Sequence, residues 1–211
     1  MAKIFIYGDK EIEYLKEKDP ALGAIINEIG MIERPVIPDL FTALVHSIVG
    51  QQISSKAMNT VWGRFEERFP EITPTTLNNA LVEEIQQIGM SMRKATYIKE
   101  AASKVLSGEL NIDELYTLSE EEVIDKLTAM HGIGVWTAEM IMIFCMQRPN
   151  IMSYGDFAIR KGLRILYQLE KLDKKQFNNY KLRYSPYASV ASLYIWAVAS
   201  GKSSLKEDEK R

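Results

Sequence analysis

The residues with the clearest capacity for chemistry lie in a short turn between two expected helices. The stretch 127–138 reads LTAMHGIGVWTA, so Gly132 and Gly134 stand on either side of one isoleucine, just before the second helix. Glycines in such a turn leave backbone N–H groups uncovered at a helix N-terminus, where the helix dipole favours an anion. Such a turn suits a phosphate, with Gly132, Gly134 and Thr137 as the candidate contacts. The alternative is an ordinary corner between two helices, and the glycines alone do not decide.

Helical periodicity accounts for nearly every patterned segment that must position this turn. Asp39 is a good N-cap, and Ser119 with Glu122 forms a capping box. The only strand-like stretch, residues 3–7, is too isolated to build a sheet. The sequence therefore predicts an all-α fold of roughly ten helices joined by short loops. The delimited helices cover residues 40–49, 55–69, 74–88 (as one or two), 90–105, 123–130, 135–146, 157–169, 174–182 and 186–200.

Composition bounds the class of protein. With 211 residues and 46% hydrophobic content, the chain can bury a sizeable core. Its single cysteine, Cys145, excludes an internal disulfide framework and a cysteine-ligated zinc or iron–sulfur site. No stretch resembles a signal peptide, and no apolar run reaches the ~20 residues that span a bilayer. We expect an intracellular, soluble protein of the cytoplasm, nucleoid or nucleus, with no membrane partner.

Charge is distributed unevenly although the formal net charge is only −2. Residues 156–184 contain eight Lys or Arg against three acids, a balance of +5, whereas residues 109–125 are acidic. One face of the protein could therefore meet phosphates while another repels them. A scattered, solvated surface explains the same counts equally well.

Longer motifs resemble a known family. The hairpin at 127–138 and the segment 153–160 (SYGDFAIR) resemble the helix-hairpin-helix DNA glycosylase superfamily, in which an aspartate follows the Gly-hydrophobic-Gly turn; here Asp156 follows Gly134 by 22 residues. Segments 38–54 (PDLFTALVHSIVGQQIS), 88–95 (IGMSMRKA) and 185–196 extend the resemblance over most of the chain. The pattern is nearest to 3-methyladenine DNA glycosylase II, the AlkA-like branch, in the compact form without an N-terminal β-domain.

The resemblance implies that Asp156 is the catalytic residue. Cleavage of a glycosidic bond passes through an oxocarbenium-like state, which an ionised carboxylate beside the sugar stabilises directly or by orienting the attacking water. An alkylated purine already carries positive charge and leaves readily, so a second carboxyl group as general acid is not required. The alternative is that Asp156 only caps the helix at 157–169, and both roles are compatible.

Position 136 separates two reaction types within the family. Relatives that also cut the strand carry there a lysine that forms a Schiff base. This chain has Trp136, and residues 127–150 contain no lysine, which predicts a monofunctional glycosylase. Trp136, with Trp196 at a second matching position, could attract a cationic base by cation–π contact worth roughly 0.5–2 kcal/mol. Core packing is the alternative for each tryptophan.

Several further positions are implied by the same resemblance. Tyr154, Phe41 and Met140 are weaker candidates for the base pocket, as is His46, and Met140 replaces a pocket tyrosine of some relatives. The gap left by an extruded base would be filled by a wedge residue. Here the wedge is Gln52 or Ile53, because Gln52 replaces an apolar residue of the AlkA-like pattern.

DNA and ion contacts are also implied. Arg160 and Lys161 would flank the DNA strand, and the hairpin glycines would grip the backbone without reading sequence. The main-chain carbonyls of Thr128, Met130 and Ile133 would bind a monovalent cation, Na⁺ or K⁺, with a structural role. No cofactor for chemistry and no iron–sulfur cluster are expected. The partner would be double-stranded DNA carrying damaged bases, met by a monomer.

Four segments and two lobes are expected. Residues 1–38 would pack with the C-terminal lobe, 39–146 would form the lobe with the wedge and the hairpin motif (about 123–146), 147–200 would carry the aspartate and the last helices, and 201–211 would be a charged tail. We expect the active site between the lobes, where Asp156, Trp136 and Trp196 would converge. Three alternatives remain at this point: a non-catalytic DNA-binding hairpin protein, a glycosylase for hypoxanthine, etheno-adenine or oxidised bases, and a protein-interaction scaffold.

Overall fold

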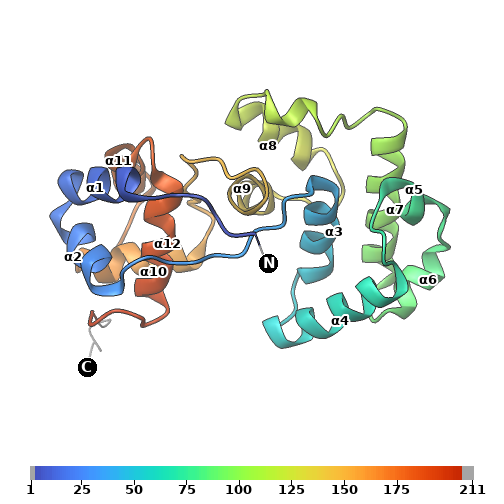
Figure 1. The fold of residues 1–211 in the computed structure, drawn as a ribbon, viewed down its shortest axis with the longest axis horizontal. Coiled ribbons are helices and arrows are strands. Elements are labelled where there is room, and N and C mark those ends of the chain that lie inside the picture. Colours follow the sequence, from blue (N-terminus) through green and yellow to red (C-terminus); the bar gives the residue numbers. More distant parts are fainter. Residues whose placement is uncertain (1–2, 206–211) are drawn as a thin grey trace. The chain divides into compact units, whose positions relative to one another are not determined.

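Helices joined by short loops make up residues 3–205, the part of the chain that this computed structural model describes (Figure 1). The contacts divide the chain into two compact units. Unit 1 combines Met1–Val36 with Met142–Arg211, and unit 2 is the continuous segment Ile37–Ile141. The sequence placed these boundaries slightly later, after residues 38 and 146.

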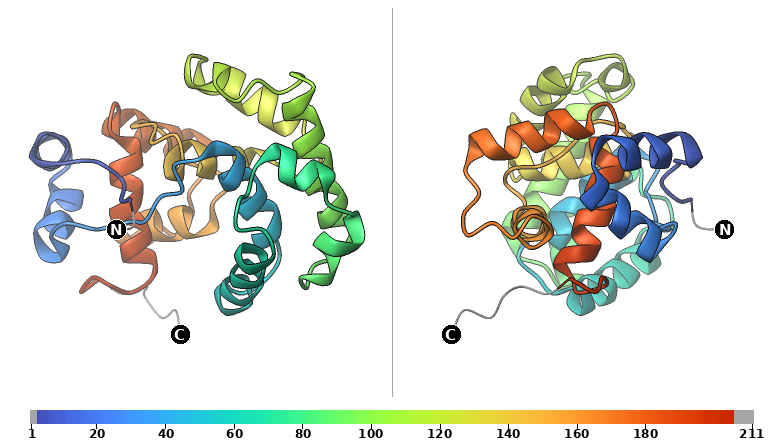
Figure 2. Two further views of the ribbon diagram at one scale, coloured as in Figure 1. Left: turned by 45° about the vertical axis from the view of Figure 1, so that its right-hand side comes forward. Right: turned by 90° about the vertical axis from the view of Figure 1, so that its left-hand side faces the viewer.

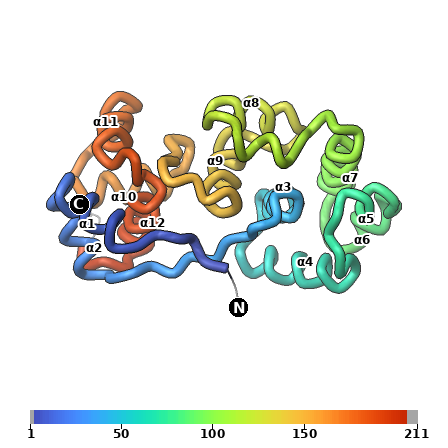
Figure 3. The backbone as a smooth tube through the Cα atoms, turned by 45° about the horizontal axis from the view of Figure 1, so that its top comes forward, coloured from blue at the N-terminus to red at the C-terminus, as the bar shows by residue number. Residues whose placement is uncertain are grey.

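Unit 1 is built around one apolar helix. Helix α12 (Ala188–Ala199) buries most of its residues, and α10 (Phe157–Leu166) packs along it. Helices α1 (Asp9–Lys18), α2 (Pro20–Ile29) and α11 (Lys174–Tyr184) complete the unit. Figures 1 and 3 show the blue helices from the start of the chain beside the orange and red helices from its end.

Helices α1 and α2 have local signals that our sequence prediction did not delimit. Asp19 accepts a hydrogen bond from the Leu22 amide at 3.0 Å, and Pro20 occupies the first position of α2. Proline is favoured there because its missing N–H is not needed in the first turn. Gly30 ends the helix with a positive φ of 72°, which glycine adopts without a steric cost.

Unit 2 is arranged around α7 (Met92–Leu106), which contacts α3, α5 and α6. In Figure 1 the green α7 lies beside the teal α5 and α6, and Figure 2 shows the same helices from two further sides. The other elements of the unit are α3 (Leu40–Gly50), α4 (Ser55–Arg68), α5 (Pro74–Asn79), α6 (Val82–Gln87), a 3-10 turn (Glu114–Tyr116), α8 (Glu120–Thr128) and α9 (Val135–Phe144), which begins here and ends in unit 1.

The expected all-α class is confirmed, with twelve α-helices in residues 3–205. Predicted caps are observed as well: Asp39 caps α3, and Ser119 and Glu122 form the capping box of α8. The strand-like stretch at 3–7 makes one isolated bridge, between Ile4 and Pro35. Within the described range, no helix is both long and apolar enough to cross a bilayer. Of the expected tail at 201–211, residues 206–211 lie outside the described residues.

Candidate functional site

Asp156 stands at the start of α10 with its carboxylate held from two sides. It is the N-cap residue, and its Oδ1 accepts a hydrogen bond from the Ile159 amide at 2.8 Å. The same oxygen accepts a second hydrogen bond from the Trp196 indole Nε1 at 3.2 Å. Only 8% of Asp156 is exposed. The helix-cap interpretation is thus correct, and it leaves an oriented, buried carboxylate that can still serve chemistry.

The close packing of α10 on α12 is what brings Trp196 to Asp156. A Cβ added at Gly162 would lie 2.3 Å from the Ile195 carbonyl oxygen, so only glycine allows this approach. Phe144 contacts the Trp196 ring at a centroid distance of 5.5 Å. The sequence reasoning missed Gly162, although an isolated glycine inside a helical pattern is a signal for close packing.

Tyr154, in the loop before Asp156, forms a local cluster with Arg160 of α10. Arg160 donates a hydrogen bond to the Tyr154 carbonyl and places its guanidinium 5.4 Å from the Tyr154 ring. On its other side, that ring packs edge-on against Phe177 at 5.1 Å. Arg160 therefore supports the loop that leads to Asp156. The DNA contacts of Arg160 and of the half-buried Lys161 stay predictions.

The glycine hairpin belongs to unit 2 and is shaped by neighbouring side chains. Gly132 has φ of 84°, and an added Cβ would meet the Tyr97 ring at 2.6 Å. Gly134 differs, because an added Cβ would meet no atom within 4 Å. Gly132 is thus required by backbone and packing, whereas Gly134 keeps the space before α9 open. Open space over helix-terminal amides is the arrangement that anion binding requires.

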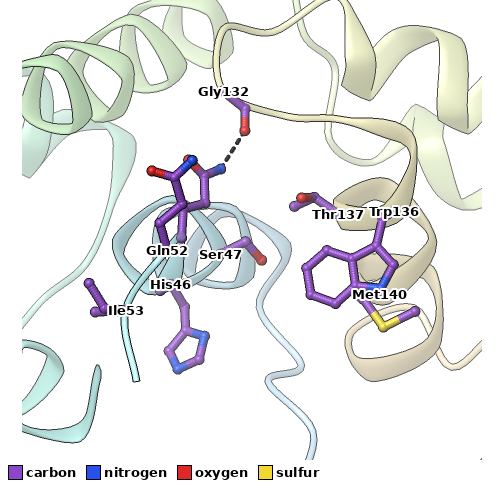
Figure 4. A pocket seen from close by; sticks show the side chains of 10 residues that line it. His46, Ser47, Gln52, Ile53, Gly132, Trp136, Thr137 and Met140 are labelled. Carbon is purple, nitrogen blue, oxygen red and sulfur yellow. Dashed lines mark hydrogen bonds between the residues drawn. The ribbon is translucent and has the colours of Figure 1, made fainter. Parts of the chain in front are cut away.

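A pocket of about 620 Å³ lies in unit 2 beside the hairpin (Figure 4). Trp136, which is 48% exposed, and Met140 line it from α9, and Thr137 joins them although it is itself buried. The corner after α3 contributes Gln52 and Ile53. The remaining lining residues are His46, Ser47, Gly50, Gln51 and Gly132.

Two weaker pocket candidates have different environments. His46 lines this pocket and packs edge-on against Trp62 at 4.7 Å. Burial lowers the pKa of His46, although Glu66 opposes the shift. Phe41 is only 2% exposed and is not among the residues that line the pocket. Its environment is that of a core residue of α3.

The structure thus sorts the predicted site residues into two groups. Asp156, Trp196 and Tyr154 are gathered in unit 1, and Trp136, Met140, Gln52, Ile53 and the hairpin glycines are gathered in unit 2. The convergence of Asp156, Trp136 and Trp196 stays a prediction. The predicted cation ligands lie in the hairpin, where the Met130 carbonyl accepts the Ile133 amide at 3.2 Å. Among the described residues, no cluster of His, Cys, Asp or Glu could hold a metal ion.

An all-α chain with a glycine hairpin and a buried aspartate at a helix start has the features of a helix-hairpin-helix protein. The HhH-GPD superfamily base excision DNA repair protein model matches residues 45–184. The chain is 34% identical over 166 residues to DNA-3-methyladenine glycosylase 1 of Schizosaccharomyces pombe, covering 74% of this chain and 71% of that protein. The chain therefore belongs to the HhH-GPD superfamily of base excision DNA repair proteins.

Solved structures agree with this assignment and confirm the expected fold. The crystal structure of a DNA-3-methyladenine glycosidase from Bacillus halodurans superposes with a TM-score of 0.82, at 36% identity, covering 93% of this chain and 92% of that chain. A 3-methyladenine DNA glycosylase of Schizosaccharomyces pombe in complex with abasic DNA gives a TM-score of 0.78 at 28% identity, covering 92% and 98%. The resemblance to the 3-methyladenine glycosylase branch is thereby confirmed.

Proposed function

We propose that this protein is a monofunctional DNA glycosylase of base excision repair that removes alkylated purines of the 3-methyladenine and 7-methylguanine class. The observation that carries the proposal is the buried carboxylate of Asp156, oriented by the Trp196 indole and the Ile159 amide. Family membership and the names of the similar proteins support the substrate class.

The chemistry assigned to Asp156 is stabilisation of positive charge. As the glycosidic bond breaks, the sugar gains oxocarbenium character, and a fixed carboxylate next to it stabilises that charge or orients water for attack. Hydrogen bonds to Oδ1 hold the carboxylate before the reaction, so little reorganisation is needed at the transition state. The bonding electrons leave with the base, which is neutralised because an alkylated purine starts as a cation.

Trp136 supports both the substrate class and the single activity. Its half-exposed indole lines the unit 2 pocket, where it would contact a cationic base. A tryptophan has no amine to form a Schiff base with the sugar, so strand cleavage by that route is closed. We therefore expect release of the free base and an abasic strand that stays intact.

The hairpin and the corner after α3 would serve DNA binding and extrusion. Amides at Gly132 and Gly134 would hold a backbone phosphate, with Gln52 or Ile53 as the wedge; Ile53 is 37% exposed. The carbonyl oxygens of Thr128, Met130 and Ile133 are hard donors of the kind that suits Na⁺ or K⁺, which would have a structural role only. The protein would act as a monomer on double-stranded DNA.

Base release by wild type and by Asp156→Asn tests the activity. Asparagine caps a helix as well as aspartate does, so α10 keeps its start while the negative charge is lost. We expect the variant to lose about 10²–10³-fold or more in the rate of release from methylated duplex DNA. Chromatography identifies the free bases, and a denaturing gel run without alkali reports strand cleavage.

The outcomes separate the alternatives. Release of 3-methyladenine by wild type with unbroken strands, together with loss in the variant, supports the proposal. DNA binding by both proteins without any release would mean that the hairpin is a binding module. Strand cleavage without alkali would contradict the monofunctional assignment.

A further inference from the structure

Two parts of unit 2 that are distant in sequence are joined by a side-chain hydrogen bond. The wedge corner, Gln51–Ile53, follows α3, and the hairpin turn contains Gly132. The Gln51 Nε2 donates to the Gly132 carbonyl, and Figure 4 shows this bond as the dashed line ending on Gly132. Gln51, which contacts the proposed phosphate-binding turn, thus stands next to Gln52 and two residues before Ile53, the two candidates for the wedge.

Helix α7 supports the wedge corner through the side chain of Lys94. Lys94 Nζ donates to the Val49 carbonyl at 2.8 Å and to the Gln51 carbonyl at 2.7 Å. These carbonyls lie at the C-terminus of α3, where helix carbonyls lack intrahelical partners and the dipole favours a cation. Lys94 therefore fixes the position at which α3 ends and the corner begins.

The same helix supports the hairpin turn. Tyr97 fills the space above Gly132, and its ring stacks on His131 at a centroid distance of 5.8 Å. Glu100 Oε2 lies 2.7 Å from His131 Nδ1. Since Lys94, Tyr97 and Glu100 follow one another at intervals of three, they share one face of α7. One helix face thus holds both the corner and the hairpin.

The corner is held in an unfavourable backbone conformation. Gln52 has φ of 56°, in the left-handed region that residues other than glycine adopt rarely. Such a conformation persists only where the surrounding contacts determine it. Here the contacts are those of the preceding residue, because Gln51 is bonded through its carbonyl to Lys94 and through its side chain to Gly132.

Building on the proposed function, we propose that Gln51 is a positioning residue that fixes the wedge corner to the hairpin, with α7 as a common brace. Extruding a base from an intact pair costs a few kcal/mol. A flexible wedge corner would be displaced by the DNA and would not push the base out. A corner that is hydrogen-bonded to the hairpin turn keeps its position against the DNA stack. Gln51 thus acts on extrusion, while Gln52 or Ile53 enters the stack.

Gln51→Met tests this role, because methionine has a similar size and cannot donate to the Gly132 carbonyl. Single-turnover release of 7-methylguanine is measured from two duplexes, with the base opposite cytosine or opposite an abasic-site analogue. We expect a loss of about tenfold on the cytosine duplex and less than about twofold on the other, because only the paired base requires full extrusion work. Affinity for undamaged DNA should stay close to that of wild type.

The chain provides a matched control on the same helix. Lys99, also on α7, donates to the carbonyls of Asn78 and Ala80 at the end of α5, so it has the same chemistry as Lys94. We expect Lys94→Met to reproduce the selective loss on the paired duplex. Lys99→Met should leave the ratio between the two duplexes unchanged, even if stability falls.

A loss on both duplexes alike would place Gln51 in chemistry or in direct DNA contact and overturn the proposal, as would no loss on either. Hydrogen exchange of the hairpin amides gives a readout that does not depend on activity. Gln51→Met should speed exchange around Gly132, and unchanged exchange would overturn the brace. Failure of wild type to release any base would contradict the glycosylase activity, while the exchange result would still decide the brace.

Discussion

At Asp156, one carboxylate oxygen carries two hydrogen bonds of different origin. The bond from the Ile159 amide belongs to the helix cap and would exist in any capped helix. The bond from the Trp196 indole comes from 40 residues further along the chain and depends on tertiary packing. Helix capping does not account for this second bond.

Trp196→Phe tests the indole N–H while keeping an aromatic ring against Phe144. Loss of a hydrogen bond to a charged group costs about 1.5–3 kcal/mol, so we expect the single-turnover rate of base release to fall by about tenfold or more. DNA affinity should change little. Trp62→Phe in α4 serves as the control for the change of ring. It keeps an aromatic ring against His46, which lines the pocket, so base release should fall by much less than in Trp196→Phe. Full activity of Trp196→Phe would show that the ring matters and the N–H does not.

Among the elements, helices α10 and α12 can pack closely against each other only because residue 162 is a glycine. A methyl group at position 162 would overlap the Ile195 carbonyl, which is backbone and cannot move aside cheaply. We expect Gly162→Ala to lower the free energy of unfolding by about 3 kcal/mol and to reduce base release by displacing Trp196 from Asp156. Urea unfolding and the release assay measure the two effects.

Gly63→Ala is the corresponding control. Gly63 lies inside α4, and an added Cβ there would meet no atom within 4 Å. Alanine is favoured over glycine in a helix interior, so the free energy of unfolding should rise by about 0.5–1 kcal/mol. Equal effects of the two substitutions would mean that the α10–α12 contact is not the cause.

The elements that could be predicted from sequence are those with local signals. Asp39 and Ser119 cap helices through amides three residues away, and such patterns are visible in any short window. Residues 8–30 contain comparable signals, but without a long apolar stripe they were not delimited. The candidate site depends on signals of the same kind, because Asp156 and the hairpin belong to short motifs. The bond between Gln51 and Gly132 spans 81 residues, and no local pattern encodes it.

On the scale of the whole molecule, an ionic contact between a buried carboxylate and a half-exposed arginine connects the two ends of unit 1. Asp19, which is 2% exposed, accepts hydrogen bonds from the Tyr167 hydroxyl at 2.6 Å and from Arg183 at 2.7 Å. Burial by itself would raise the pKa of Asp19, but these bonds and the Leu22 amide outweigh it, so the pKa is lowered. The contact joins α2 to residues that follow α10 and lie in α11.

Asp19→Asn should therefore destabilise the protein in a pH-dependent way. Because the folded pKa lies below the unfolded one, the contribution is complete at neutral pH and is lost as the pH falls through the folded value. We expect a loss of about 3 kcal/mol at pH 7 that shrinks below about pH 4. Unfolding of both proteins across this range measures the difference. Glu13→Gln, at an exposed ion pair with Lys16, should cost less than about 0.5 kcal/mol.

Unit 1 combines the first and the last parts of the chain, so during synthesis it can be completed only after unit 2. All of unit 2 has been translated by Ile141, so its contacts are available while the rest is still being made. Helices α1 and α2, although made first, meet α11 and α12 only when those segments have left the ribosome. The apolar faces of α1 and α2 therefore lack these packing partners while more than a hundred further residues are synthesised. A nascent chain halted once all of unit 2 has left the ribosome should thus present a folded unit 2 preceded by helices that chaperones can still bind.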